Sequence, residues 1–347
     1  MTRLVVTAIG PASSVQDGGR RGFQRYGLTP GGAMDPLALA AANTLLGNDP
    51  FAAAVEIGPL GAAFTACDGA VRLALTGASR AADIAGRPVA LDSSMIVKEG
   101  ETLTLGTARD GCFSYLALEG GLRGTPLFGS LSVNARAGLG SPYPRPLQAG
   151  DELSASTAVV GPENRIELAK RADGPIRVIM GPQNDEFSED AIALFLSASW
   201  TVSAVSDRMG YRLEGPSLVH RHGHNIVSDG TVNGSIQVPG NGQPIVLMPD
   251  RGTSGGYPKI ATVISADLGR LAQTPPGQRV GFQAVNLADA HAELKALADL
   301  IRTLPDRLRP ADGSGVNVEA LQDANLAGIA VSAIDPGTWQ NERGESS

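Results

Sequence analysis

The sequence predicts a mainly β protein with two tandem barrel subdomains and a few helices. It contains 44 glycines and 23 prolines among 347 residues, a combined share above the roughly 12% of average proteins. Between these residues, short apolar runs recur about every ten residues, the spacing typical of strands in a barrel or sandwich. The pattern occurs twice with a break between, which favours two related barrels.

A strand at Leu4–Ile9 opens the first half, and a helix with clear end signals follows. Asp35 is the predicted N-cap, Pro36 the first helical residue, 37–46 the body and Gly47 the residue beyond the end. Further strands are predicted between about Val55 and Leu153, among them Val71–Leu75, Met95–Val97, Leu103–Leu105 and Tyr115–Leu118. Residues 1–157 therefore form the predicted N-terminal barrel subdomain.

Residues 158–174 lose this rhythm and are predicted to be a linker. The C-terminal barrel subdomain is predicted at 175–286, with a helix at Ser188–Ser197 and strands at Ile176–Met180, Trp200–Val205, Ser235–Val238, Pro244–Leu247, Ile260–Ile264 and Arg279–Val285. The last segment, 287–347, begins with apolar residues seven apart, which predict a helix from about Leu287 to Leu304 and then a tail. A packing helix is the simpler interpretation, and a partner-binding helix is the alternative.

Composition and charge exclude several classes of protein. The net charge is −7 and only four lysines occur, without any basic run, so a nucleic-acid partner is not expected. No apolar stretch approaches the roughly 20 residues of a membrane span, and Gly10 and Pro11 interrupt the N-terminal apolar run. We therefore expect a cytoplasmic protein. Cys67 and Cys112 lie in apolar surroundings and are interpreted as small buried hydrophobic residues.

Common catalytic signatures are absent from the sequence. It has no phosphate loop, no nucleophile elbow, no paired C-x-x-C and no Met-Lys biotin-attachment pattern. His220, His222 and His224 alternate, which on a strand would place three imidazoles on one face. A zinc site needs converging ligands with supporting partners, and Gly223 interrupts the run. A solvated hairpin tip is the preferred interpretation, and no metal site is predicted.

Three polar, glycine-rich segments carry the candidate chemistry: 15–35, 206–215 and 226–259. Glycines let backbone N–H groups approach a ligand closely, and arginines supply a fixed fork for a carboxylate or phosphate. Two adjacent pairs, Asp207–Arg208 and Asp250–Arg251, could serve a substrate or form structural ion pairs. Tyr257 could close a pocket or cap a core.

At these segments the chain resembles a known family. The matching stretches are Gln16-Asp-Gly-Gly-Arg, Gly32-Ala-Met-Asp-Pro-Leu-Ala-Leu, Ala42-Asn, Leu46-Gly-Asn-Asp, Gly181-Pro-Gln, Ser206-Asp-Arg-Met-Gly-Tyr-Arg-Leu-Glu-Gly, Gly234-Ser-Ile-Gln-Val-Pro-Gly and Gly255-Gly-Tyr-Pro-Lys-Ile-Ala. They resemble the allophanate hydrolase subunit 2 family, which includes the C subunit of 5-oxoprolinase, KipI antagonists and the C-terminal half of the carboxyltransferase domain of urea carboxylase. The resemblance runs from about residue 3 to 286.

This resemblance implies cyclophilin-like barrels and a subunit 1-like (KipI-type) partner, separate or fused. For stand-alone bacterial members it implies ATP-dependent hydrolysis of 5-oxoproline to L-glutamate, in a complex with a lactam-utilisation subunit and with ATP possibly bound on a partner chain. For urea carboxylase relatives it implies carboxyl transfer to an amide such as urea, which needs biotin supplied by another chain. The third interpretation is a non-enzymatic antagonist of a kinase-inhibitor partner. We favour the 5-oxoprolinase-type subunit.

The predicted site binds a small amide or lactam. The predicted catalytic residues are Asp250, Arg251, Gln237 and Tyr257. The predicted substrate-binding residues are Asp17, Asp35, Asp207, Arg208, Arg212, Gly255, Gly256 and Lys259. Arg208 and Arg251 are expected to hold a substrate carboxylate, and Gln237 a planar amide.

Two departures from the family pattern leave the choice of amide open. Leu131 and Val133 follow Gly129-Ser130, where an arginine and a threonine are usual. Gly252 and Ser254 stand in a run that usually reads Asp-Arg-Gln-Thr-Thr.

Overall fold

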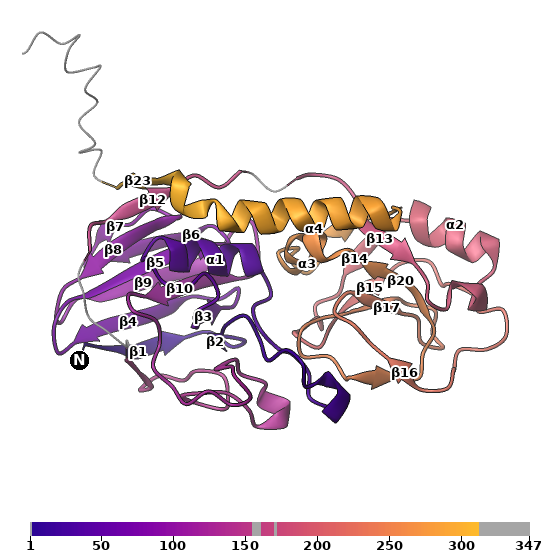
Figure 1. Cartoon of the computed structure of the whole chain (residues 1–347), viewed down its shortest axis with the longest axis horizontal. Helices are drawn as coiled ribbons and strands as arrows, with labels where there is room; N and C mark the ends of the chain where they lie inside the picture. The colour runs from indigo at the N-terminus through magenta and orange to yellow at the C-terminus, as the bar shows by residue number, and fades with distance from the viewer. Residues whose placement is uncertain (1, 155–160, 170–171, 312–347) are drawn as a thin grey trace, which may run out of the picture.

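The computed structural model describes residues 2–154, 161–169 and 172–311. Strands dominate, which confirms the predicted mainly β class with tandem barrel subdomains. Figure 1 shows the two β subdomains next to each other, with one long helix along a side of both. No helix within the described ranges is long and apolar enough to cross a membrane.

The N-terminal subdomain consists of two sheets that enclose one core. The first sheet has the order β11 (Glu152–Ser154), β1 (Arg3–Ile9), β4 (Ala62–Cys67), β9 (Thr102–Ala108), β6 (Arg80–Ile84) and β7 (Arg87–Pro88). The second has the order β2 (Ser14–Gln16), β3 (Ala54–Ile57), β10 (Ser114–Leu118), β5 (Val71–Gly77), β8 (Ser93–Val97), β12 (Asn164–Ile166) and β23 (Leu308–Pro310). Leu4, Phe64 and Leu116 lie in the core between them.

Helix α1 (Pro36–Thr44) covers the outer face of the second sheet, where it contacts β5 and β10. It begins where predicted, because the Asp35 side chain accepts a hydrogen bond from the Ala38 N–H at 3.2 Å. Along β5, Leu73 faces the barrel core while Ala74 faces the helix. The alternation of a strand therefore gives this sheet two apolar faces. The helix body ends at Thr44, two residues before the predicted end.

The C-terminal subdomain is a nearly closed barrel built from one sheet. Its strand order is β21 (Arg279–Val280), β14 (Trp200–Val202), β15 (Gly210–Glu214), β18 (Ile245–Leu247), β17 (Ser235–Gln237), β20 (Lys259–Val263), β13 (Ile176–Met180) and β22 (Phe282–Ala284). Only Gly281 separates β21 from β22, so the two ends of the sheet meet. The predicted strand at Arg279–Val285 is therefore two short strands, and β15 lies inside a segment interpreted as a polar loop.

Shorter elements complete the chain. Helices α2 (Glu189–Ser197) and α3 (Leu268–Ala272) belong to the C-terminal subdomain, and β16 (Asp229–Gly230) pairs with β19 (Ser254–Gly255) as a separate two-stranded sheet. The 3₁₀ helices are η1 (Gln24–Tyr26), η2 (Ala135–Ala137), η3 (Asn184–Glu186), η4 (Ser265–Asp267) and η5 (Leu304–Arg307).

The segments predicted as linker and tail contribute strands to the N-terminal subdomain. β12 lies within 158–174, and it pairs with β8 on one side and with β23 on the other. Ile166 of β12 is buried. This stretch is therefore a packed part of the fold and not only a linker between the subdomains. Residues 312–347, the predicted tail, lie outside the described residues.

Helix α4 (Leu287–Arg302) crosses from the C-terminal to the N-terminal subdomain (Figure 1). Its predicted apolar stripe is buried only in part: Ala290 is covered, whereas Leu287 is 58% and Leu294 44% exposed. An ion pair between Arg177 and Glu293, at 2.8 Å, ties the helix to β13.

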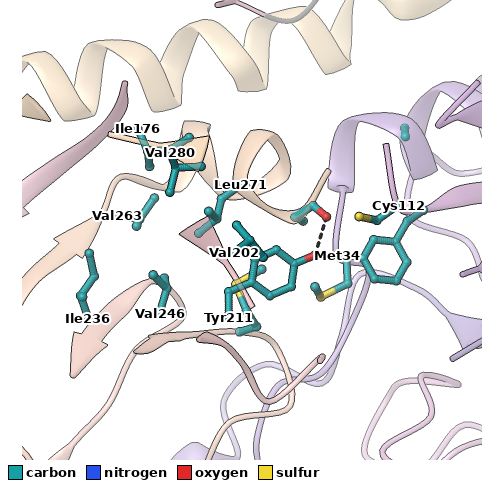
Figure 2. Close-up of a cluster of buried hydrophobic side chains, with 14 of the residues drawn as sticks. Met34, Cys112, Ile176, Val202, Tyr211, Ile236, Val246, Val263, Leu271 and Val280 are labelled. Atoms are coloured by element: carbon teal, nitrogen blue, oxygen red, sulfur yellow. Dashed lines mark hydrogen bonds between the residues drawn. The ribbon is translucent and has the colours of Figure 1, made fainter. Parts of the chain in front are cut away.

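The two subdomains share a continuous apolar core. Figure 2 shows Met34 and Cys112 of the first subdomain facing Tyr211 of the second, whose hydroxyl donates to the Ala272 carbonyl at 2.6 Å. Gln273 supplies the polar contacts at this interface. Its amide nitrogen donates to the Asp35 carboxylate and the Phe113 carbonyl, and its oxygen accepts from the N–H groups of Cys112 and Phe113. The subdomains therefore pack as one body.

Candidate functional site between the two subdomains

An ion cluster centred on Arg208 joins the subdomains next to this core. Arg208 donates from Nε to Asp250 Oδ2 at 2.8 Å and from Nη2 to Asp250 Oδ1 at 3.0 Å. Its Nη1 donates to Glu56 Oε1 on β3 at 2.6 Å, and Nη2 also donates to the Gly32 carbonyl at 2.8 Å. The planar guanidinium fork thus fixes a C-terminal carboxylate against the N-terminal sheet.

Glu56 is fully buried and has its own supporting contacts. Its Oε2 accepts from the Tyr115 hydroxyl at 2.7 Å and from the Met34 N–H at 2.8 Å. Burial and the negative charges of Glu56 and Asp35 raise the pKa of Tyr115 well above its usual range, so its hydroxyl stays a donor. Burial would lower the pKa of Arg208, but the charges of Glu56 and Asp250 outweigh burial and raise it.

A cavity of about 330 Å³ lies beside this cluster. Cys112, Phe113 and Tyr211 line its apolar wall, and Arg208 and Asp250 line its polar end. Its size falls at the lower end of the range of about 300–1,000 Å³ for small-molecule sites. Burial raises the pKa of Cys112 to about 11, so this residue is a neutral thiol at neutral pH and not an activated nucleophile.

Asp17 organises the loop that covers the cluster. Its carboxylate accepts from the Ser130 hydroxyl at 2.7 Å, the Leu131 N–H at 2.6 Å and the Gly19 N–H at 2.7 Å, and also from the Ser132 hydroxyl. These neutral donors occupy both oxygens, so Asp17 shapes the backbone of two loops at once.

Arg251 lies next to Asp250 in the chain and points into the interior. It is 3% exposed, and its Nη2 donates to Gln24 Oε1 on η1 at 3.0 Å. Gln24 in turn donates to the Thr231 carbonyl at 2.6 Å. Burial lowers the pKa of Arg251 to about 10, which still leaves it charged at neutral pH.

A second polar cluster lies on the C-terminal barrel. Gln237 of β17 is paired with Lys259 of β20, and the buried Lys259 ammonium binds Asp229 Oδ2 at 2.8 Å. Gln183 donates to the same Asp229 oxygen at 3.0 Å. Gly255 lets the Gln237 amide approach closely, because a Cβ at this position would displace the Gln237 amide nitrogen.

The two-stranded β16–β19 ladder links the two clusters. Its Asp229 end contacts Lys259, while Thr231 bonds to Gly252 beside Arg251 at the other end. The three residue steps from Gly252 to Gly255 can span at most about 10 Å. The two clusters are therefore close along this part of the chain.

The structure divides the predicted site residues into three groups. The first group lies around the junction between the subdomains and consists of Asp17, Asp35, Arg208, Asp250 and Arg251, with Asp207 lining the cavity there. The second group lies at or beside the second cluster and consists of Gln237, Gly255, Gly256 and Lys259. Arg212 and Tyr257 line a separate hollow of about 410 Å³ on the C-terminal barrel.

Neither adjacent Asp–Arg pair forms an ion pair within itself. Arg208 binds Asp250 instead, and Asp207 holds a turn by accepting from the N–H groups of Met209 and Gly210 at 2.8 and 3.2 Å. The sequence left open whether these arginines form structural ion pairs. Arg208 does form one, but its partner Asp250 lies 42 positions away in the chain.

Several residues of the junction were missed by sequence reasoning, namely Arg20, Gln24, Glu56, Tyr115 and Gln273. Glu56 carried a usable signal, since a carboxylate inside the apolar run Ala54–Ile57 is rarely buried without a charged partner. Arg20 lies in the matching stretch Gln16-Asp-Gly-Gly-Arg, but Gln24, Tyr115 and Gln273 have no local pattern that marks them.

The three alternating histidines do not form one cluster, although the ring centroids of His220 and His224 lie 6.4 Å apart. His220 bonds to the Val238 carbonyl at 2.9 Å, His222 approaches Glu186 at 3.3 Å, and His224 is exposed. Over the part of the chain that the structure describes, no group of three or more His, Cys, Asp or Glu side chains could hold a metal ion.

Comparison with known proteins adds the family context. The family described as "Carboxyltransferase domain, subdomain A and B" matches residues 26–284. The C subunit of the Escherichia coli 5-oxoprolinase is 39% identical over 304 residues, which cover 85% of this chain and 94% of the relative. The protein of the same name from Haemophilus influenzae is 38% identical over 80% of this chain and 90% of that protein.

Larger proteins also contain a similar region. The urea amidolyase of Lachancea kluyveri is 29% identical over 87% of this chain but only 18% of its own length. The crystal structure of K. lactis urea amidolyase superposes with a TM-score of 0.80 at 26% identity, over 89% of this chain and 21% of that chain. The structure of TTHA0988 superposes with a TM-score of 0.74 at 32% identity, over 82% of this chain and 56% of that one.

Proposed function

Because this chain belongs to the carboxyltransferase domain family of subdomains A and B, we propose that it is an enzyme subunit that holds a small amide or lactam between its two barrels. The two 5-oxoprolinase relatives, similar over nearly their whole length, favour one reaction. In this proposal the chain is part of a complex that hydrolyses 5-oxoproline to L-glutamate at the expense of ATP.

The observation that carries the proposal is the Arg208–Asp250 pair at the polar end of the cavity. Each carboxylate oxygen has two lone pairs, so the bonds from Arg208 leave Asp250 able to accept from the N–H of a lactam. Arg208 fixes the position of the Asp250 carboxylate, and Glu56 fixes Arg208. A preorganised acceptor of this kind favours the build-up of positive charge on nitrogen as the C–N bond breaks.

We retain Gln237 and Lys259 as proposed site residues. In the alternative carboxyl transfer an amide meets an activated carboxyl group, and the two clusters, which the β16–β19 ladder links, could each take one reactant. Gln237 has both a donor and an acceptor for a planar amide. Tyr257, Arg212 and Gly256 are proposed to border this second site.

We place ATP binding on a partner chain. The sequence has no phosphate loop. In addition, the Lys259 ammonium is paired with Asp229, and the fork of Arg208 is occupied by Asp250 and Glu56. The expected partners are a subunit 1-like protein and a lactam-utilisation subunit.

A second candidate function is carboxyl transfer to urea or a related amide. The superposition on urea amidolyase favours it. The same polar end of the cavity would then hold the amide, and a separate chain would bring the biotin.

Co-expression with the neighbouring genes tests the proposal. The purified complex should hydrolyse ATP in a 5-oxoproline-dependent way and release glutamate, while this chain by itself should be inactive. Glutamate release by the single chain would contradict the proposed division of labour. A complex that carboxylates urea and ignores 5-oxoproline would overturn the main proposal in favour of the second.

A further inference from the structure

Two buried arginines at the junction lack carboxylate partners. Arg20 is 1% and Arg251 3% exposed, and in each the Nε and Nη1 atoms have no hydrogen-bond partner among the described residues. Each arginine has one hydrogen bond to a neutral acceptor: Arg20 Nη2 donates to the Ser132 carbonyl, and Arg251 Nη2 donates to the Gln24 side chain at 3.0 Å. Four buried guanidinium nitrogens therefore point at no acceptor.

Other buried arginines in the described residues are better satisfied. Arg72 forms an ion pair with Glu119 at 2.8 Å. All three side-chain nitrogens of Arg80 have partners, namely the Ser114 hydroxyl and the carbonyls of Gly58, Leu60 and Gly106. Buried donors are normally paired. Among the described residues Arg72 leaves only its Nε without a partner, whereas Arg20 and Arg251 each leave two nitrogens.

The carboxylates near the two arginines form their hydrogen bonds with other donors. Arg208 occupies both oxygens of Asp250 and one of Glu56. Serine hydroxyls and backbone N–H groups occupy Asp17. Burial lowers the pKa of both Arg20 and Arg251, and the charge of Asp250 only partly offsets this. A buried cation without a paired anion is unfavourable, and a bound anion would relieve it.

The backbone brings the two arginines toward one place. The Gly31 N–H donates to the Pro249 carbonyl at 3.3 Å, which sets the loop after Arg20 against the loop that carries Arg251. A Cβ on Gly31 would lie 3.2 Å from Arg20 Nη1 and 3.7 Å from Asp250 Oδ1. Because Gly31 has a positive φ of 62° and no side chain, its backbone can lie close to both Arg20 Nη1 and the Asp250 carboxylate.

We propose that Arg20 and Arg251 bind a small oxyanion at the junction of the two subdomains. Guanidinium forks suit a planar carboxylate, and bicarbonate or phosphate shares that chemistry. Arg208, which the sequence suggested for this role, already has acidic partners for its fork. The inference rests on the proposed function only in naming the carboxylate of 5-oxoproline as the physiological ligand.

Thermal unfolding of the full chain tests the site without any catalytic assay. Acetate, 5-oxoproline, bicarbonate and phosphate are titrated at constant ionic strength against chloride. The wild type should show a saturable rise in Tm with at least one oxyanion, and Arg20→Met and Arg251→Met should each lose it. The matched control is Arg21→Met, an exposed neighbour, which should keep the wild-type response.

A second variant, Arg251→Lys, keeps the test valid if the methionine variants misfold. Its affinity for the same oxyanions is measured by calorimetric titration. Lysine keeps the charge but lacks the fork, so affinity should fall at least tenfold. No saturable response in the wild type, or an unchanged response in Arg251→Met and Arg251→Lys, would overturn the site. Binding of acetate or phosphate but not of 5-oxoproline would support the site and count against the proposed substrate, so the two failures are distinguishable.

Discussion

Arg208 of the C-terminal barrel donates to Glu56 of the N-terminal barrel at 2.6 Å while its other nitrogens hold Asp250. The same side chain thus serves the interface and the candidate site. Its position depends on Tyr115 and Met34, which fix Glu56 from the N-terminal side. Any change at this contact is expected to affect subdomain packing and the Asp250 carboxylate together.

Loss of Arg208 should destabilise the chain far more than loss of an exposed arginine. Arg208→Met leaves the carboxylates of Glu56 and Asp250 without their cation, an effect of about 3–5 kcal/mol. The control is Arg87→Met, because Arg87 pairs with Glu101 at 2.8 Å but is 61% exposed, and its loss should cost under about 1 kcal/mol. Urea denaturation measures the free energy of unfolding of both variants. If the two substitutions lower it equally, the Arg208 cluster contributes no more to stability than an exposed ion pair.

The two cysteines should differ in reactivity. Cys112 is 4% exposed, lines the cavity and has a pKa raised to about 11 by burial, whereas Cys67 is half-buried. Iodoacetamide should therefore label Cys67 first at neutral pH, and mass spectrometry of the peptides gives both rates. A ligand that fills the cavity should slow Cys112 further. Equal labelling rates for Cys67 and Cys112 in the native protein would contradict the burial of Cys112.

Acid stability should depend on Asp267. Burial by itself would raise the pKa of Asp267, but hydrogen bonds from Arg177 and the charge of Arg270 outweigh it and lower the pKa. A depressed carboxyl pKa gives stability that is present above the unfolded value of about 3.9 and is lost as pH falls through the lower folded value. Asp267→Asn should remove this dependence. Urea midpoints between about pH 5 and pH 2 provide the measurement, and parallel curves for the two proteins would refute the assignment.

Gln237 and the histidine run should contribute differently to turnover. Gln237→Ala in the assembled complex should reduce kcat about 10²-fold, the scale for loss of a positioned catalytic group. Changing His220, His222 and His224 together to alanine should leave turnover within about threefold, because their contacts are to Val238, to Glu186 and to solvent. Activity that is lost with the histidines and restored by zinc would move the site elsewhere.

Local signals predicted much of the fold. The cap at Asp35 and the strand at Ile176–Met180 were placed correctly because cap chemistry and apolar runs act over a few residues. β12 was assigned to the linker because its pairing partners, β8 and β23, lie far away in the chain. The polarity of 206–215 concealed β15, whose Tyr211 and Leu213 face the core while Arg212 faces out.

The candidate site was less accessible from sequence. Motifs identified Arg208 and Asp250, but not that they bind each other across 42 positions. Glu56 and Gln273 act through contacts that exist only once the barrels pack. Spacing along the chain cannot reveal such long-range pairing.

The most direct test of a site between the barrels is steady-state kinetics of the assembled complex with Asp250→Asn. Asparagine keeps the shape of the side chain but removes the charge that Arg208 holds at the cavity. Wild-type complex should release glutamate from 5-oxoproline in an ATP-dependent way, and the variant complex should assemble normally with kcat lower by about 10²-fold or more. Turnover within about threefold of wild type, in a variant complex of normal composition, would contradict a site built on Asp250 between the two barrels.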